Sequence, residues 1–151
     1  MLKTLSIASL LFFLGCSAGA QQNPTPPKTA PPAPYTIPIE AVRQVNPVKP
    51  TSESIALGKK WYGYDCAMCH AKDGDGKGGV GADMKLKVSD LSDPATLKDR
   101  TDGELFYIIK NGKGDMPPEG TRLKSDELWS LVNYVRSLAK KNAPPEDKKR
   151  Q

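Results

Sequence analysis

The clearest pattern of apolar positions lies toward the C-terminus of the chain. It consists of Leu128, Leu131, Val132, Val135 and Leu138. These positions recur every three or four residues, which is the spacing of one face of an α-helix. Ser125 stands before them as the expected N-cap, and Lys140 falls in the last turn, where a cation is favourable. The pattern predicts a helix with one buried face, ended by Pro144 and Pro145.

A second helix is expected in the middle of the chain. Thr51 or Ser52 can cap it, and it runs to about Tyr64 with Glu53 in its first turn. Gly58 lies in its interior, where glycine costs up to about 1 kcal/mol relative to alanine. Two interpretations follow: either another helix passes close to Gly58, or the glycine is tolerated on the surface.

A third helix begins at a capping-box pattern, Thr101 with Glu104, and ends at Asn111-Gly112. Residues 113–118 then form a loop without helix or strand pattern. The glycine-rich residues 73–81 are expected to be an irregular loop that passes close to other groups, and residues 89–94 a turn. No alternating apolar pattern is long enough for a strand, so the predicted fold class is all-α.

Composition divides the chain further. Residues 1–20 have the form of an export signal, with Lys3 before an apolar stretch. Nine of the fourteen prolines fall in residues 21–50, which predicts an extended linker. Its apolar exceptions are Ile37, Ile39, Val42 and Val45. They lie against the domain or a partner, or they are only an ordered approach to the next helix. The domain is expected at 51–142, followed by a charged tail at 143–151.

The candidate chemistry is in Cys66-Ala67-Met68-Cys69-His70. Two thiols three residues apart, followed at once by an imidazole, have the spacing of covalent c-type haem attachment. One helical turn places both sulfurs to reach the two haem vinyl groups, and the next residue directs its imidazole at the iron. His70 is the only histidine of the chain.

Two other interpretations fit this motif less well. A zinc site needs four ligands, and the only other thiol is Cys16, within the export signal. A redox CxxC of the thioredoxin kind requires a βαβ pattern, which does not surround Cys66 and Cys69. Haem attachment is the interpretation that these residues favour.

Over about residues 52–140 the chain resembles the class I cytochromes c. Residues 58–62 resemble the family's first helix, with its glycine and aromatic at a helix crossing, and residues 131–134 resemble the matching part of its last helix. Met116-Pro117 resembles the segment with the axial methionine. The match is better to small bacterial monohaem members than to mitochondrial ones. The chain has no clear proline shortly after His70 to accept its second N–H.

The resemblance implies a class I cytochrome c fold, with three to five helices around one covalent haem c. Cys66 and Cys69 would form the thioethers, His70 would be the proximal iron ligand, and Met116 the distal one. Met84 or an open sixth position are the alternatives for the distal side. Such a protein carries single electrons and is not an enzyme. The competing class is a haem enzyme of the peroxidase kind, or a redox or gas sensor, with an open sixth position.

The expected localisation is the bacterial cell envelope, where the chain would be exported to the periplasm. Phe13-Leu14-Gly15-Cys16 resembles a lipobox, which would lipidate Cys16 and hold the protein at a membrane. Ordinary cleavage after Ala20 would instead leave a soluble periplasmic carrier.

Charge narrows the range of partners. The formal net charge is +5, but residues 51–142 contain fifteen Lys/Arg against fourteen Asp/Glu, so the domain itself is nearly balanced. A nucleic-acid partner therefore has no support beyond the short basic run at residues 148–150. The expected partners are redox proteins that donate and accept electrons, with a quinol-oxidising complex and a terminal oxidase as candidates.

Overall fold

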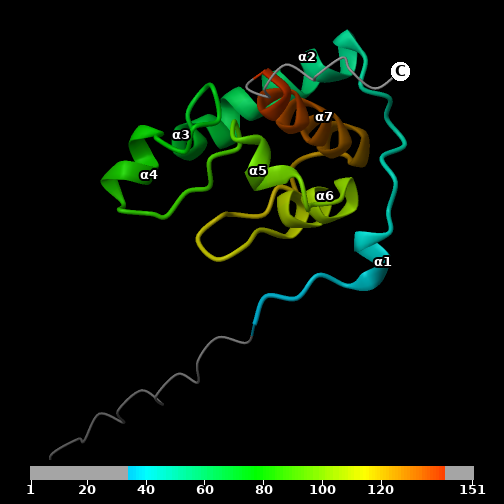
Figure 1. Ribbon diagram of the computed structural model, residues 1–151, viewed down its shortest axis with the longest axis horizontal. Helices are drawn as coiled ribbons and strands as arrows, with labels where there is room; N and C mark the ends of the chain where they lie inside the picture. The colour runs from blue at the N-terminus through cyan, green and yellow to red at the C-terminus, as the bar shows by residue number, and fades with distance from the viewer. Residues whose placement is uncertain (1–33, 142–151) are drawn as a thin grey trace, which may run out of the picture. The chain divides into compact units, whose positions relative to one another are not determined.

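Three helices form the frame of the computed structural model, which describes residues 34–141. They are α2 (Ser52–Trp61), α6 (Asp102–Asn111) and α7 (Ser125–Lys141). Figure 1 shows α2 crossing over α7, with α6 on the other side of α7. Within residues 34–141 the only β pairing is an isolated bridge between Lys113 and Met116, so the all-α prediction is confirmed.

The remaining helical segments are short. They are α1 (Ile39–Val42), a π-helix (Tyr62–Cys66), α3 (Ala67–His70), α4 (Gly79–Asp83) and α5 (Pro94–Leu97). The prediction of irregular structure was wrong at α4, and the turn predicted at residues 89–94 leads directly into α5. A helix of four or five residues spans little more than one turn, so it leaves no periodic apolar pattern in the sequence.

Local capping fixes where the three long helices begin. Thr51 and Ser54 cap α2 reciprocally, and Thr101 and Glu104 do the same for α6, as the capping-box pattern predicted. α7 begins at Ser125, so Ser125 is its first residue and not its cap. The Glu127 carboxylate accepts a hydrogen bond from the backbone N–H of Lys124, at 2.8 Å.

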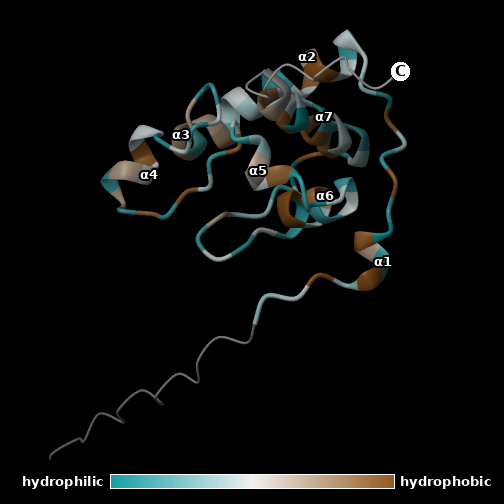
Figure 2. Ribbon diagram, in the orientation of Figure 1, coloured by the Kyte–Doolittle hydropathy of each residue, from teal (hydrophilic) through white to brown (hydrophobic). Residues whose placement is uncertain are grey.

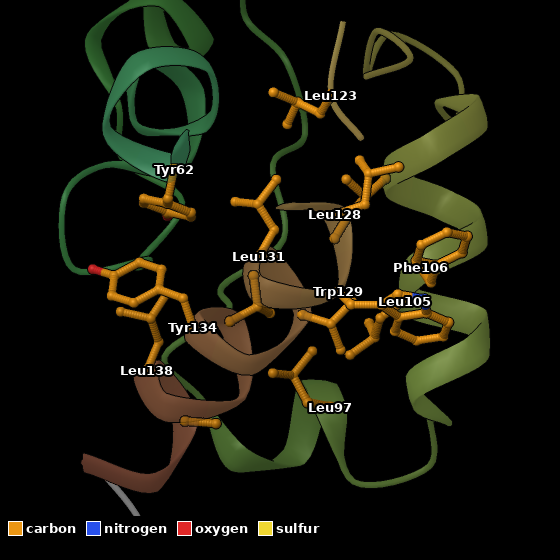
Figure 3. Close-up of a cluster of buried hydrophobic side chains, with 14 residues drawn as sticks. Tyr62, Leu97, Leu105, Phe106, Leu123, Leu128, Trp129, Leu131, Tyr134 and Leu138 are labelled. Atoms are coloured by element: carbon orange, nitrogen blue, oxygen red, sulfur yellow. The ribbon is translucent and has the colours of Figure 1, made fainter. Parts of the chain in front are cut away.

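The core lies where α7 meets α2 and α6. All five apolar residues of the predicted stripe on α7 are buried, with Val132 fully inaccessible. Figure 3 shows Phe106 of α6 facing Trp129 of α7, and their rings stack with centroids 4.0 Å apart. In Figure 2 the apolar residues of α6 and α7 contrast with the mainly hydrophilic loop that joins the two helices.

α2 and α7 cross with their backbones in contact. A Cβ at position 58 would overlap the backbone carbonyl of Ser130, so only glycine fits at this crossing. One turn further along, the rings of Tyr62 and Tyr134 meet edge to face at 5.0 Å. The close-approach interpretation of Gly58 is confirmed, and the surface-glycine interpretation was wrong.

Residues 34–50 lie against the helical frame, and we call this segment the strap. Ala41 is buried, Ile37 and Val42 are half-buried, and Ile39 and Val45 are exposed. The apolar residues of the strap are thus divided between contact with the domain and exposure to solvent. Whether the linker and domain meet near residue 50 stays a prediction.

Several predicted features lie outside the described residues. They are the export signal, Cys16, the first part of the linker and the C-terminal tail. Among residues 34–141, the helices fall short of the length and apolar character that crossing a bilayer requires.

Candidate functional site

The motif residues are brought together on a short stretch of helix. α2 continues into the π-helix, whose wider turn ends at Cys66, and α3 then contains Cys69 and His70. Cys66 and Cys69 are both free thiols and half-buried. The two cysteines and the histidine therefore lie on two consecutive short helical segments.

A backbone carbonyl orients His70. Its Nδ1 lies 3.2 Å from the carbonyl oxygen of Ser89. Because that oxygen can only accept, Nδ1 must carry the proton, which leaves the Nε2 lone pair free for a metal. Burial lowers the pKa of His70, although the hydrogen bond to Ser89 opposes this, so the neutral imidazole is favoured. The Ser89 carbonyl thus accepts the second N–H of His70, for which the sequence showed no clear proline.

The glycine-rich loop folds back under this helix. Ala71 turns the chain with φ of 63°, and the Tyr62 hydroxyl donates to its carbonyl at 2.9 Å. The N–H of Gly76 then donates to the carbonyl of His70, and the N–H of Gly78 to that of Cys69. A side chain at Gly78 would overlap the backbone of the attachment helix. These glycines therefore allow close packing against α3 and satisfy its free carbonyls.

Met116 lies in the loop between α6 and α7. It is half-buried against the core, whereas Met68 and Met84 are 50% and 63% exposed. Its backbone pairs with Lys113 through two hydrogen bonds of 3.0 Å, which close a tight turn directly before Pro117. Of the three methionines among residues 34–141, Met116 is the one that the fold holds inward.

A group of charged side chains beside Cys66 was not singled out from the sequence. Arg122 binds Asp65 at 2.6 Å and approaches Glu119 at 3.3 Å, and both carboxylates are almost fully buried. We call these three residues the Arg122 cluster. It links the π-helix to the loop that contains Met116. No sequence signal could have found it, because Glu119 and Arg122 lie 54 and 57 positions after Asp65 and share no motif with it.

The environment of Cys66 bears on how a group could be attached to it. Burial, together with the carboxylates of Glu119 and Asp65, raises the pKa of the Cys66 thiol to about 12. The thiol therefore stays protonated at neutral pH, and a protonated thiol is a poor nucleophile. The folded chain therefore holds the Cys66 thiol in its less reactive form.

The residues present fit haem c. Covalent attachment uses two thiols at CxxC spacing, and iron ligation uses an imidazole nitrogen with its lone pair free. Cys66 and Cys69 provide the first, and His70, whose Nδ1–H is held by Ser89, provides the second. Among residues 34–141, His, Cys, Asp and Glu do not gather in threes in a way that could hold a metal ion by themselves.

An all-α frame with crossing terminal helices and a CxxCH turn defines the class I c-type cytochromes. Residues 53–135 match the sequence model of the family described as cytochrome C oxidase, cbb3-type, subunit III. The chain belongs to this family of c-type cytochromes. It is therefore a haem c protein and a one-electron carrier that exchanges electrons with redox proteins, and not an enzyme.

Two relatives, each matched over most of its own length, support the same conclusion. The chain is 36% identical to cytochrome c6 of Cladophora glomerata over 84 residues, which is 56% of this chain and 88% of that protein. It is 35% identical to cytochrome c6 of Leptolyngbya boryana over 86 residues, 57% of this chain and 94% of that protein.

One solved structure is similar to this fold. It is a chain of the Kuenenia stuttgartiensis reducing HAO-like protein complex Kustc0457/Kustc0458, with a TM-score of 0.54 and 28% sequence identity. The similarity covers 61% of the present chain but only 46% of that one, so it concerns less than half of the larger protein.

Proposed function

We propose that this chain carries single electrons between redox proteins of the bacterial cell envelope, through a haem c held by four of its residues. Cys66 and Cys69 form the thioethers, His70 is the proximal iron ligand and Met116 the distal one. The observation that carries the proposal is the hydrogen bond from His70 Nδ1 to the Ser89 carbonyl, because it prepares Nε2 for iron.

The bound haem supplies the change between ferrous and ferric iron, and the protein determines how readily that change occurs. Ser89 fixes the plane of the His70 imidazole, and the glycine-rich loop fixes the helix that bears it. The apolar side chains on α7 exclude water from the interior. Because each of these groups is held in place, little reorganisation accompanies electron transfer.

Met116 is the favoured distal ligand on two grounds. It is the inward-facing methionine of the described residues, and its backbone is held by the turn with Lys113. A thioether ligand raises the reduction potential and suits electron transfer. Met84, which is 63% exposed, is the alternative distal ligand.

The distal ligand is tested by paired substitutions. Met116→Ala in the holoprotein is expected to abolish the weak red absorption band of methionine-ligated ferric iron and to lower the reduction potential. Met84→Ala is the control, and it should keep the absorption band and the reduction potential of the wild type. Loss of the band in Met84→Ala, with the band intact in Met116→Ala, would overturn the assignment.

Export and anchoring are the second part of the proposal. The leader with its apolar stretch supports export, and the resemblance of residues 13–16 to a lipobox supports a lipid on Cys16. A quinol-oxidising complex and a terminal oxidase are the proposed partners. Mass spectrometry of the mature protein decides the anchor: a lipidated Cys16 at the N-terminus supports it, and an unmodified N-terminus at Gln21 excludes it.

A further inference from the structure

The strap lies outside the stretch that matches the family, which begins at residue 53. We propose that Tyr35 of the strap is a positioning residue, which holds the Gly112–Lys113 peptide and through it the Met116 segment. The proposal rests on the proposed function in one respect, namely that Met116 is the distal ligand. Its structural part, the restraint on the loop, stands independently of that ligand.

The argument begins with a single peptide unit that is bonded at both ends. The Tyr35 hydroxyl donates to the carbonyl of Gly112 at 2.9 Å, across 77 positions of sequence. The N–H of Lys113, which belongs to the same peptide, donates to the carbonyl of Met116 at 3.0 Å. Because a peptide unit is planar and rigid, fixing its carbonyl also fixes the direction of its N–H. Tyr35 therefore aims the donor that holds Met116.

The backbone at Gly112 leaves little room for another arrangement. Gly112 is buried and has φ of 75°, in the left-handed region that favours glycine. A Cβ at this position would lie 2.5 Å from the carbonyl oxygen of Met116. The two ends of the turn are thus in direct contact, and a displaced Gly112 peptide would displace Met116 with it.

Side chains from the domain hold the Tyr35 ring. It packs edge to face on Tyr107 of α6, with centroids 6.4 Å apart, and the Lys113 ammonium lies 5.5 Å from its centre. Tyr35 is nevertheless 41% exposed, so water competes for its hydrogen bond. The expected effect is accordingly that of one net hydrogen bond.

The strap can act as a fixed point because it is itself anchored to α6. The backbone carbonyl of Ala41 lies against Gly103, where a Cβ would overlap it. The Thr101 hydroxyl donates to the carbonyl of Val42 at 2.8 Å. Figure 1 shows α1 beside α6, with the strap then running along the outside of the domain toward α2.

The strap is anchored to α7 as well. Asn46 donates to the side-chain oxygen of Asn133 at 2.8 Å, and Asn133 donates to the carbonyl of Val48 at 3.0 Å. Asn133 is buried and Asn46 is half-buried, so these bonds are partly sheltered from water. Tyr35 thus extends from a segment that is fixed on two helices of the frame.

The test is Tyr35→Phe in the full-length holoprotein, which keeps the ring and removes the hydroxyl. Tyr64→Phe is the matched control, since it removes the hydroxyl of a tyrosine that is 62% exposed and packs on Trp61. Amide hydrogen exchange at Lys113 and Met116 should accelerate by about two- to tenfold in Tyr35→Phe only. The affinity of the ferric protein for imidazole, which competes with Met116, should rise by the same factor. This range corresponds to about 0.4–1.4 kcal/mol, close to the net value of one hydrogen bond.

The two readouts separate the proposals from one another. Wild-type exchange at Lys113 in Tyr35→Phe, or equal acceleration in Tyr64→Phe, would overturn the role of Tyr35. Accelerated exchange with an unchanged imidazole affinity would confirm the restraint and refute its action on an iron-bound Met116. Loss of the methionine band in Met84→Ala and not in Met116→Ala would refute the ligand assignment of the proposed function, while the exchange result still decides the restraint.

Discussion

Gly58 shows how one residue determines the way the frame is assembled. It lies where α2 crosses α7, and the carbonyl of Ser130 occupies the place that a side chain would need. Tyr62 and Tyr134 pack beside the crossing and add an edge-to-face aromatic contact. Because the attachment motif follows directly on α2 and the π-helix, this crossing also sets the position of Cys66 relative to the core.

Gly58→Ala is expected to destabilise the holoprotein by about 1–3 kcal/mol, because two helix backbones must separate to admit the methyl group. This overpacking outweighs the gain of about 1 kcal/mol that alanine brings to a helix interior. Gly63→Ala is the matched control, since a Cβ at Gly63 meets nothing within 4 Å. Denaturant unfolding of both variants measures the effect, and a stability loss in Gly63→Ala equal to that in Gly58→Ala would contradict the explanation.

At the scale of elements, the Arg122 cluster joins the π-helix to the loop between α6 and α7 that contains Met116, which we call the methionine loop. Two buried carboxylates share one guanidinium. Glu119 Oε2 lies 3.3 Å from it without hydrogen-bond geometry, and Asp65 Oδ2 also has no hydrogen bond among the described residues. Burial, and then the Asp65 charge, raise the pKa of Glu119, with Arg122 opposing them. The ionised form of Glu119 is therefore disfavoured in the folded protein.

The raised pKa of Glu119 gives the pH dependence of stability a definite sign. The folded state binds the Glu119 proton more tightly than the unfolded state, so this contribution to stability is full below the unfolded pKa of about 4.3. It is lost as pH rises through the higher pKa of the folded state. The difference in unfolding free energy between Glu119→Gln and the wild type should therefore shift in favour of the variant as pH rises from about 4.3. It should level off once pH exceeds the folded-state pKa of Glu119. Urea unfolding of both proteins across this pH range measures the difference.

The control for that series is Glu40→Gln, which removes an exposed carboxylate from α1. It measures how much of any change comes simply from removing one negative charge. A difference between Glu119→Gln and the wild type that does not vary with pH would mean that Glu119 does not titrate in this window.

At the scale of the whole molecule, the charges of the domain are interleaved. Lys77 pairs with Asp75, and Arg136 pairs with Asp102, so neighbouring charges of opposite sign cancel locally. The candidate site has the same mixture, with Lys113 and Asp115 both in the methionine loop. Where charges of opposite sign alternate in this way, their fields oppose one another, and a charged partner is expected to be steered only weakly.

Electron exchange with a redox partner is therefore expected to slow by less than about tenfold between 0.01 M and 0.15 M ionic strength. The Debye length falls from about 30 Å to about 8 Å over this range, which would strongly weaken steering by a segregated patch. Stopped-flow reduction of the holoprotein across the series measures the rate. A fall of several orders of magnitude would show that the folded domain separates its charges into a docking patch.

The sequence by itself determined the features that depend on neighbouring residues. The spacing of Cys66, Cys69 and His70 specified covalent haem c, because thioether attachment requires both thiols within one turn. The apolar stripe on α7 predicted its buried face, a capping residue at Thr51 marked the start of α2, and a capping box marked the start of α6. In each case the determining contacts lie within a few positions along the chain.

Only the tertiary structure decided what depends on residues far apart or on the backbone alone. The partner of His70 is a carbonyl, which every residue possesses, so nothing in the sequence could distinguish Ser89. The Arg122 cluster and the contact from Tyr35 to Gly112 join positions more than fifty residues apart. Proline content predicted an extended linker through residue 50, but it could not reveal that the second half packs on α6 and α7. That packing depends on Gly103 and Asn133, whose surroundings exist only once the helices have assembled.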